Sequence, residues 1–219
     1  MSKTKCAIVL LASALAMPAA AQQAAAVPLE ANSEHFVFSA LSQTLALPLP
    51  DWSELAGAEP DMLLDRVSVS VRQDDNLARV EIFPRGEGEA IWSRLYGARV
   101  FSQADMTLAS LRSAIIDVYA RTCRADTIAL FQLEPDEGDN IPPLGFVCGS
   151  YLDLPGYSGQ GEVMIVGFYK SERGVATVYQ EWRGNAFDAT DSSTWPVSVD
   201  EIELRVGQFK SQTTLLAVD

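Results

Sequence analysis

The chain has 219 residues, with 16 lysines and arginines against 29 aspartates and glutamates, and a formal net charge of −13 at pH 7. This acidic balance excludes nucleic acid as a partner, because phosphate binding needs a basic surface. It argues against docking to anionic lipid for the same reason. A chain of this length suits one domain that can bury a sizeable core.

The N-terminus has the pattern of a secretory signal peptide. Lys3 and Lys5 precede an apolar run over residues 6–17, and residues 19–21 are alanines suited to cleavage. The run is shorter than the ~20 apolar residues of a membrane-spanning helix. The sequence therefore predicts a signal peptide over residues 1–21, no membrane insertion after its cleavage, and a periplasmic or secreted protein. An uncleaved N-terminal anchor is the alternative.

Two cysteines remain once the signal peptide, which contains Cys6, is removed. Cys123 and Cys148 would then meet an oxidising compartment, where an even cysteine count predicts a disulfide. A reactive thiol pair or part of a metal site is the alternative, but neither cysteine belongs to a C-x-x-C motif. Without Lys3 and Lys5, 14 basic residues face 29 acidic ones, which gives a net charge of −15. Such a charge permits a partner with a basic surface, such as another envelope protein.

Taken in order, the mature chain begins with an Ala- and Gln-rich stretch over residues 22–34, which predicts a flexible leader. A single domain is expected over residues 35–219. Residues 36–47 leave strand and helix open, and the proline-containing segment 47–61 is expected to be irregular.

From residue 67 onward, alternating apolar residues predict strands, and one 3.6-residue period predicts a helix. The expected strands are 67–72, 78–83, 91–101, 127–133, 145–152, 162–170 and 175–183. The expected helices are 108–122 and 199–209, the second opened by the capping-box spacing of Ser198 and Glu201. This order favours an α+β fold, a mainly antiparallel sheet with two helices packed on one face.

The familiar catalytic templates do not fit. The only histidine, His35, lies beside the expected leader, and is better explained as a surface or partly packed residue than as a catalytic base. The segment 156–161 resembles a nucleophile elbow, but Gln160 stands where that motif needs glycine. No phosphate loop or dinucleotide fingerprint occurs, so no cofactor and no catalytic residue is assigned.

An acidic segment offers a second candidate site. Glu134, Asp136, Glu137 and Asp139 lie within six residues, and carboxylate oxygens are the ligands that calcium prefers. The spacing is not that of an EF-hand, so a solvated acidic loop is the simpler interpretation and no metal site is assigned. Paired carboxylates for glycoside hydrolysis are conceivable among 29 acids, but no pair stands out.

The tryptophans are the remaining candidates for binding. Trp92 and Trp182 fall in expected strands beside Arg94 and Arg183, a combination that could form an aromatic binding face. Filling of the core is the simpler interpretation, and it also suits Trp52 and Trp195, because large rings dominate protein interiors.

One resemblance emerges from three short motifs. They are the stretch FPRGEGEAIWSR at residues 83–94, the pair Thr122-Cys123, and the segment FVCGS at 146–150. With its P-x-G-E stretch before a tryptophan and its two spaced cysteines, the chain resembles a group of exported bacterial proteins of unknown function. The resemblance implies an envelope protein with one disulfide, and it implies no activity and no site residues.

Three functions remain open. The first is a soluble periplasmic accessory or binding module without catalytic activity. The second is a carboxylate-based or calcium-assisted hydrolase, and the third is an acidic inhibitor of a basic envelope protein. A cleft holding two acids with raised pKa values would favour the hydrolase. A flat aromatic patch without such a cleft would favour the module.

Overall fold

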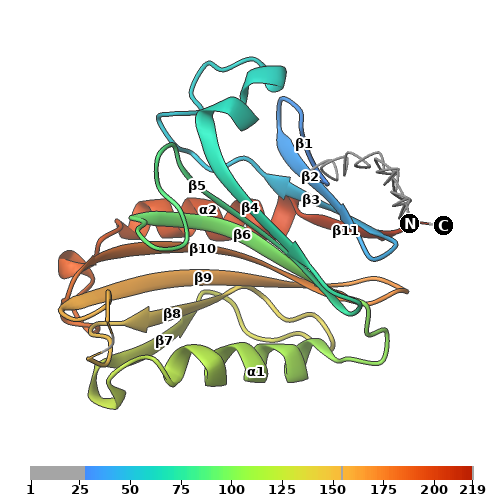
Figure 1. The fold of residues 1–219 in the computed structure, drawn as a ribbon. Helices are drawn as coiled ribbons and strands as arrows, with labels where there is room; N and C mark the ends of the chain where they lie inside the picture. The colour runs from blue at the N-terminus through green and yellow to red at the C-terminus, as the bar shows by residue number, and fades with distance from the viewer. Residues whose placement is uncertain (1–27, 154, 219) are drawn as a thin grey trace, which may run out of the picture.

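The computed structural model describes residues 28–153 and 155–218, which form two antiparallel sheets and two α-helices (Figure 1). The smaller sheet has the strand order β1-β2-β3-β11, with β1 (Leu29–Ala31), β2 (His35–Ala40), β3 (Gln43–Pro48) and β11 (Thr214–Ala217). The larger sheet has the order β4-β5-β6-β10-β9-β8-β7, with β4 (Val67–Gln73), β5 (Leu77–Pro84), β6 (Arg94–Phe101), β7 (Ile128–Gln132), β8 (Leu144–Cys148), β9 (Gln160–Lys170) and β10 (Val175–Asn185). The helices are α1 (Leu108–Ala120) and α2 (Val199–Gln212). The prediction of a mainly antiparallel α+β fold is confirmed.

Polar side chains begin both helices. The Ser198 side chain accepts a hydrogen bond from the Glu201 backbone N–H at 3.1 Å, as the capping-box spacing predicts. The Thr107 side chain accepts from the Ser110 N–H at 3.1 Å in the same way. Each cap satisfies a backbone donor that the first turn of a helix leaves unpaired.

The larger sheet is buried on both faces. In β9, Val163 and Ile165 belong to a core that includes the smaller sheet and α2, whereas Met164 and Val166 belong to a second core that includes α1. Because successive side chains in a strand point to opposite faces, these two sets define the two sides of the sheet. The continuous apolar run of β9 is typical of a strand with both faces covered.

The two helices therefore pack on opposite faces of the larger sheet, and the prediction that they share one face is wrong (Figure 1). Leu111 and Ile115 of α1 lie in one core, and Ile202, Val206 and Phe209 of α2 lie in the other. The physical reason is that β9 and β10 present apolar side chains on both sides, and each side needs its own cover.

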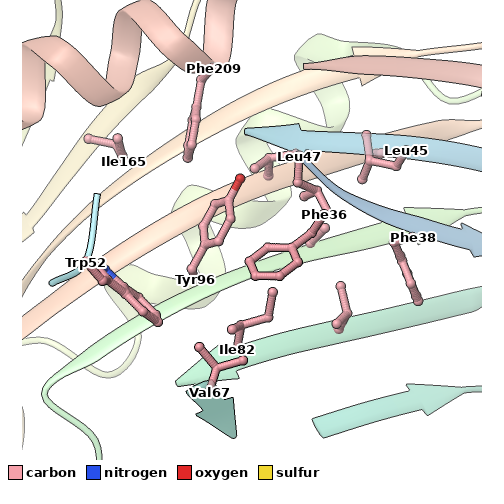
Figure 2. Close-up of a cluster of buried hydrophobic side chains, with 14 of the residues drawn as sticks. Phe36, Phe38, Leu45, Leu47, Trp52, Val67, Ile82, Tyr96, Ile165 and Phe209 are labelled. Atoms are coloured by element: carbon pink, nitrogen blue, oxygen red, sulfur yellow. The ribbon is translucent and has the colours of Figure 1, made fainter. Parts of the chain in front are cut away.

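The core on the α2 side joins the two sheets (Figure 2). Phe36 and Leu47 of the β2–β3 hairpin are fully buried and pack toward Ile82 and Tyr96 of the larger sheet. The Tyr96 ring stacks on Phe209 of α2 with 6.1 Å between ring centroids. Residues 36–47, left open between strand and helix by the sequence, are thus held as strands by packing on this core.

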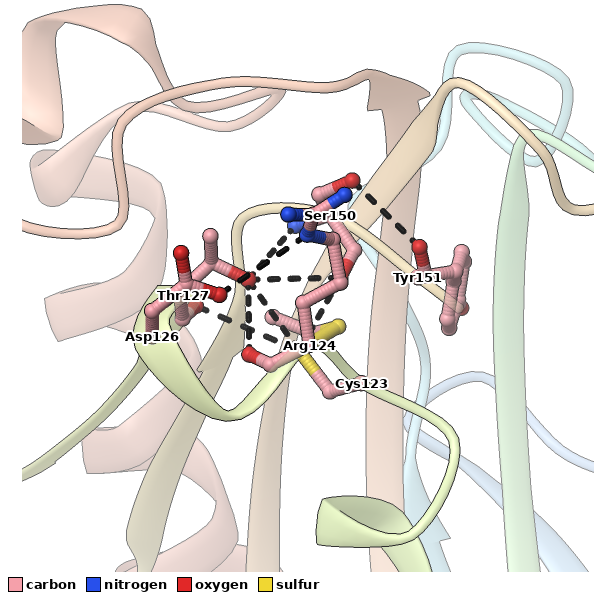
Figure 3. A network of polar contacts seen from close by, with 7 residues as sticks. Cys123, Arg124, Asp126, Thr127, Ser150 and Tyr151 are labelled. Atoms are coloured by element: carbon pink, nitrogen blue, oxygen red, sulfur yellow. Dashed lines mark hydrogen bonds and ion pairs between the residues drawn. A yellow bond between two sulfur atoms is a disulfide. The ribbon is translucent and has the colours of Figure 1, made fainter. Parts of the chain in front are cut away.

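Cys123 and Cys148 form the predicted disulfide, with 5.7 Å between their Cα atoms (Figure 3). Around it, the Arg124 N–H donates to the Ser150 carbonyl at 2.9 Å, and the Thr127 hydroxyl donates to the Arg124 carbonyl at 2.9 Å. The bridge and this network fix the chain that leaves α1 against the end of β8.

The N-terminal predictions have different outcomes. The expected signal peptide, residues 1–21, lies outside the described residues. Residues 29–31 fall within the expected flexible leader, yet they form β1 and pair with β2. Among the described residues, no helix is long and apolar enough to cross a membrane.

Candidate functional site

A cavity of about 420 Å³ opens on the α1 side of the larger sheet. Its floor comes from β5, β6, β9 and β10, and its walls come from the end of α1, the loop before β6 and the loop between β8 and β9. The lining residues are Arg79, Glu81, Phe83, Glu89, Trp92, Leu95, Arg99, Val118, Tyr119, Thr122, Tyr151, Tyr157, Glu162, Glu181 and Arg183. The volume lies within the range that small-molecule sites occupy.

Three glutamates form the polar floor of the cavity. Glu81 of β5, Glu162 of β9 and Glu181 of β10 are only 6%, 3% and 3% exposed, respectively. All three side chains point to the α1 face, because side chains two positions apart in a strand share a face. Each acid lies two residues from a member of the α1-side core, namely Phe83, Met164 or Tyr179. Buried carboxylates are costly unless they are paired or hydrogen-bonded, so this concentration of acids on one floor calls for a role.

Tyrosine hydroxyls satisfy one oxygen of each acid. Tyr119 of α1 donates to Glu181 Oε1, and Tyr151 donates to Glu162 Oε2. Tyr179 donates to Glu81 Oε1 at 3.3 Å. The Arg79 Nη1 atom lies 3.2 Å from the same oxygen and forms an ion pair with it.

Burial, together with nearby glutamate charge, raises the pKa of Tyr119 and of Tyr151 above their usual range. Both phenols therefore stay protonated and act as donors to the acids below them.

Arg183 of β10 lies beside these acids on the same face of the sheet. Its guanidinium lies over the Trp92 ring at 3.5 Å from the ring centroid, and over the Tyr157 ring at 4.6 Å. Its Nε is buried and has no hydrogen-bond partner. Its charge acts on the nearby Glu162, whose pKa it lowers. Aromatic faces thus hold the cation in place while its Nε–H has no partner among the described residues.

The environment shifts Glu162 and Glu181 toward their neutral forms. Burial raises the pKa of Glu181 to about 8, and the charge of the nearby Glu162 adds to that rise. Burial also raises the pKa of Glu162 to about 6, against the opposing effects of the Tyr151 hydrogen bond and the Arg183 charge. The cavity therefore keeps a proton on its floor at neutral pH.

These shifts predict how stability depends on pH. Because the folded-state pKa of Glu181 lies above the ordinary 4.5, the folded chain holds a proton that the unfolded chain releases. The bound proton stabilises the folded state in full below pH ~4.5. This stabilisation is lost as the pH rises to about 8, at up to about 1.4 kcal/mol of unfolding free energy per pH unit. Urea unfolding at pH 5, 6.5 and 8 should show that the unfolding free energy of the Glu181→Gln variant declines less with rising pH than that of the parent protein. An identical decline in both proteins would contradict the raised pKa of Glu181.

Gly97 lets the floor form. A Cβ at this position would lie 2.7 Å from the Val80 carbonyl oxygen and 2.8 Å from the Tyr179 hydroxyl. The Gly97→Ala variant should therefore lose about 1–3 kcal/mol of unfolding free energy through overpacking, as measured by urea denaturation. The matched control is Gly207→Ala in α2, where an added Cβ would meet nothing within 4 Å. Equal losses of unfolding free energy in the two variants would show that the Tyr179 ring is not packed against the backbone at Gly97.

The four tryptophans have different surroundings. Trp52 and Trp182 lie in the α2-side core, and Trp92 belongs to the α1-side core and also lines the cavity, from the loop before β6 and not from the expected strand. Arg183 lies over Trp92, whereas the sequence neighbour Arg94 lies 5.3 Å from the centroid of the Trp52 ring. Trp195 stacks on Phe131 with 5.8 Å between centroids.

The acidic segment over residues 134–139 lies outside this cavity, and two of its acids pair with the helices. Asp136 accepts from Arg112 of α1 at 2.7 Å, and Glu134 accepts from Lys210 of α2 at 2.7 Å. Within residues 28–153 and 155–218, no group of three His, Cys, Asp or Glu side chains is placed to hold a metal ion. The loop is thus tied down by its own ion pairs.

Two other candidates from the sequence lie elsewhere. His35 Nε2 is 3.0 Å from the Gln212 carbonyl oxygen, away from the residues that line the cavity. In the glycine-containing segment 156–161, residues 156–159 form a turn with positive φ at Gly156 and Gly159, residues 160–161 begin β9, and Tyr157 reaches the cavity wall.

The acids on the floor were missed by motif analysis. Glu81, Glu162 and Glu181 each stand next to apolar residues in a strand with buried neighbours, a position where a charged residue is expensive. That interruption is the signal by which the sequence marks them.

Comparison with protein-family models, curated proteins and solved structures found no match for this chain.

Proposed function

We propose that this chain is an exported protein that binds a small polar molecule in the cavity beside the end of α1. The single observation that carries the proposal is the state of Arg183. Its guanidinium is stacked between Trp92 and Tyr157 at the cavity, and its buried Nε has no hydrogen-bond partner among the described residues. A cation whose plane is already fixed by aromatic rings is pre-organised to bind an anionic group of a ligand.

The floor supports the same conclusion. Protein pockets that bind small molecules combine apolar walls with a few convergent polar groups and with acids of perturbed pKa. Here Trp92 and Tyr157 supply the walls, and Glu162 and Glu181 supply the acids.

Export to the periplasm or beyond is part of this proposal. The disulfide between Cys123 and Cys148 is the kind that persists in oxidising compartments. The signal-like residues 1–21 and the resemblance to exported bacterial proteins support the same location.

A thermal-shift screen with small polar compounds tests the binding function. A ligand at 100 times its Kd should stabilise the protein by about 2.7 kcal/mol, which raises the Tm by about 5–10 °C. The Arg183→Gln variant should lose most of that shift. The control variant, Arg121→Gln, alters an exposed ion pair with Asp117 and should keep it. Shifts that survive in full in Arg183→Gln would contradict the proposal.

A hydrolase is the second candidate, favoured by one observation. Glu162 and Glu181 share the cavity and both have raised pKa values, and the pairing of acids in different environments is how carboxylate enzymes divide the roles of acid and base. A panel of chromogenic glycosides and esters tests it. Turnover that disappears in both Glu162→Gln and Glu181→Gln would establish the hydrolase, and no turnover by the folded parent protein would rule it out for those substrates.

A further inference from the structure

We infer that the molecule bound in this cavity is a small zwitterion, such as a free α-amino acid, whose carboxylate is bound by Arg183 and whose ammonium group is bound by Glu162. This inference rests on the proposed binding function and narrows it to one chemical class.

The first step is the register of the two charged residues. Glu162 of β9 lies directly opposite Arg183 of β10 in the antiparallel ladder. Residues so placed have Cα atoms about 4.5–5.5 Å apart, close enough for opposite charges to pair. The Arg183 guanidinium lies over the Trp92 ring, and its charge is near enough to act on Glu162, although no salt bridge joins the two side chains in the described structure.

The second step is the unused bonding capacity on each side. Arg183 has a planar fork of donors that matches a carboxylate, and Trp92 and Tyr157 already hold its plane in place. Glu162 accepts the Tyr151 hydrogen bond at Oε2, and its Oε1 accepts none from the described residues. A molecule carrying an anion and a cation on neighbouring atoms would satisfy both.

The third step excludes ligands with charge of a single sign. An anion alone would bring its charge toward the Glu162 carboxylate, whereas a cation alone would meet the arginines Arg79, Arg99 and Arg183. Like charges brought together in a partly buried site are strongly unfavourable. Both signs on the ligand match both signs on the lining, and the cavity of about 420 Å³ has room for a molecule of amino-acid size.

Isothermal titration calorimetry with the oxidised protein tests the inference. The probes are glycine, alanine, glutamate, lysine and phenylalanine, and then the N-acetyl and amide derivatives of the tightest binder. Because each blocked end loses a hydrogen-bonded charge pair, each derivative should bind about 10- to 100-fold more weakly than the free amino acid.

Two variants assign each end of the ligand to its residue. In Arg183→Gln, the residue that binds the carboxylate is gone, so the amide should bind as well as the free amino acid. In Glu162→Gln, the residue that binds the ammonium group is gone, so the N-acetyl derivative should bind as well as the free amino acid. The control variant, Glu172→Gln in the exposed β9–β10 turn, should keep the full preference for the free form. Loss of preference at the predicted end, and only there, is a result that a purely structural role would not produce.

The outcomes separate this inference from the function beneath it. Free amino acids that bind no better than their blocked forms would overturn the zwitterion and leave the binding function standing. The same holds if none of the five binds while another compound class shifts the Tm in a manner that depends on Arg183. If no compound class binds, both the inference and the proposed function fall.

Discussion

Removing the disulfide, in the Cys123→Ser/Cys148→Ser double variant, is expected to lower the free energy of unfolding by about 3–4 kcal/mol. The bridge closes a loop with a sequence separation of 25, and in the chain-entropy model such a cross-link restricts the unfolded ensemble by this amount. Urea unfolding followed by circular dichroism measures the loss.

Reduction supplies the control for that variant. The parent protein in dithiothreitol should unfold at the same urea concentration as the double variant, and the variant itself should not respond to reductant. A parent protein whose stability is unchanged by reductant, or whose two thiols react with an alkylating agent before reduction, would contradict the bridge.

Removing the disulfide should also loosen one wall of the cavity. Tyr119 and Thr122, which lie just before Cys123, form part of the cavity wall. Without the bridge, the end of α1 is less firmly held against β8, so Tyr119 is less well placed to donate to Glu181.

The second large effect is expected at Phe209. This residue is fully buried, stacks on Tyr96 and anchors α2 between the two sheets. The Phe209→Ala variant should lose about 3–5 kcal/mol, the usual cost of removing a buried phenylalanine. Urea denaturation provides the measurement.

A conservative replacement separates packing from a general effect of substitution in α2. Phe209→Leu keeps most of the apolar volume and should lose much less than Phe209→Ala. Lys210→Ala, at the next position along the helix, removes only a surface ion pair and should lose less than about 1 kcal/mol. If the loss from Phe209→Ala were no larger than that of Lys210→Ala, α2 would not be packed on this core.

Local patterns accounted for most of the fold. The alternation of Val67, Val69 and Val71 predicted β4, and the apolar stripe containing Leu111 and Ile115 predicted α1. The strand expected over residues 91–101 begins only at Arg94, since the preceding residues form a loop. The short β11 was missed, because its four residues carry no distinctive period.

The arrangement of the helices was not predictable from such patterns. Periodicity shows which face of a helix is apolar, but it does not show which side of a sheet that face will cover. The information lay in β9, where Val163, Met164, Ile165 and Val166 are consecutive apolar residues. Such a run indicates a strand buried on both faces, and hence cover on both sides of the sheet.

The cavity was predicted least well. Its three floor acids come from strands that are far apart in sequence, and only the order β5-β6-β10-β9 brings them together. Trp92 and Arg183 were both singled out from the sequence, but as members of different pairs. Register, which decides that Glu162 faces Arg183, depends on the folded ladder and not on a local motif.

The most direct test of the central claim is where ligands bind. Amide chemical shifts of the isotope-labelled oxidised protein, recorded with a library of small polar fragments, report every contact site at once. We predict that the shifts concentrate at residues that line the cavity, among them Glu81, Trp92, Tyr119, Tyr157, Glu162 and Arg183. Fragments that bind only elsewhere on the described surface, or that leave these residues unmoved, would contradict the account.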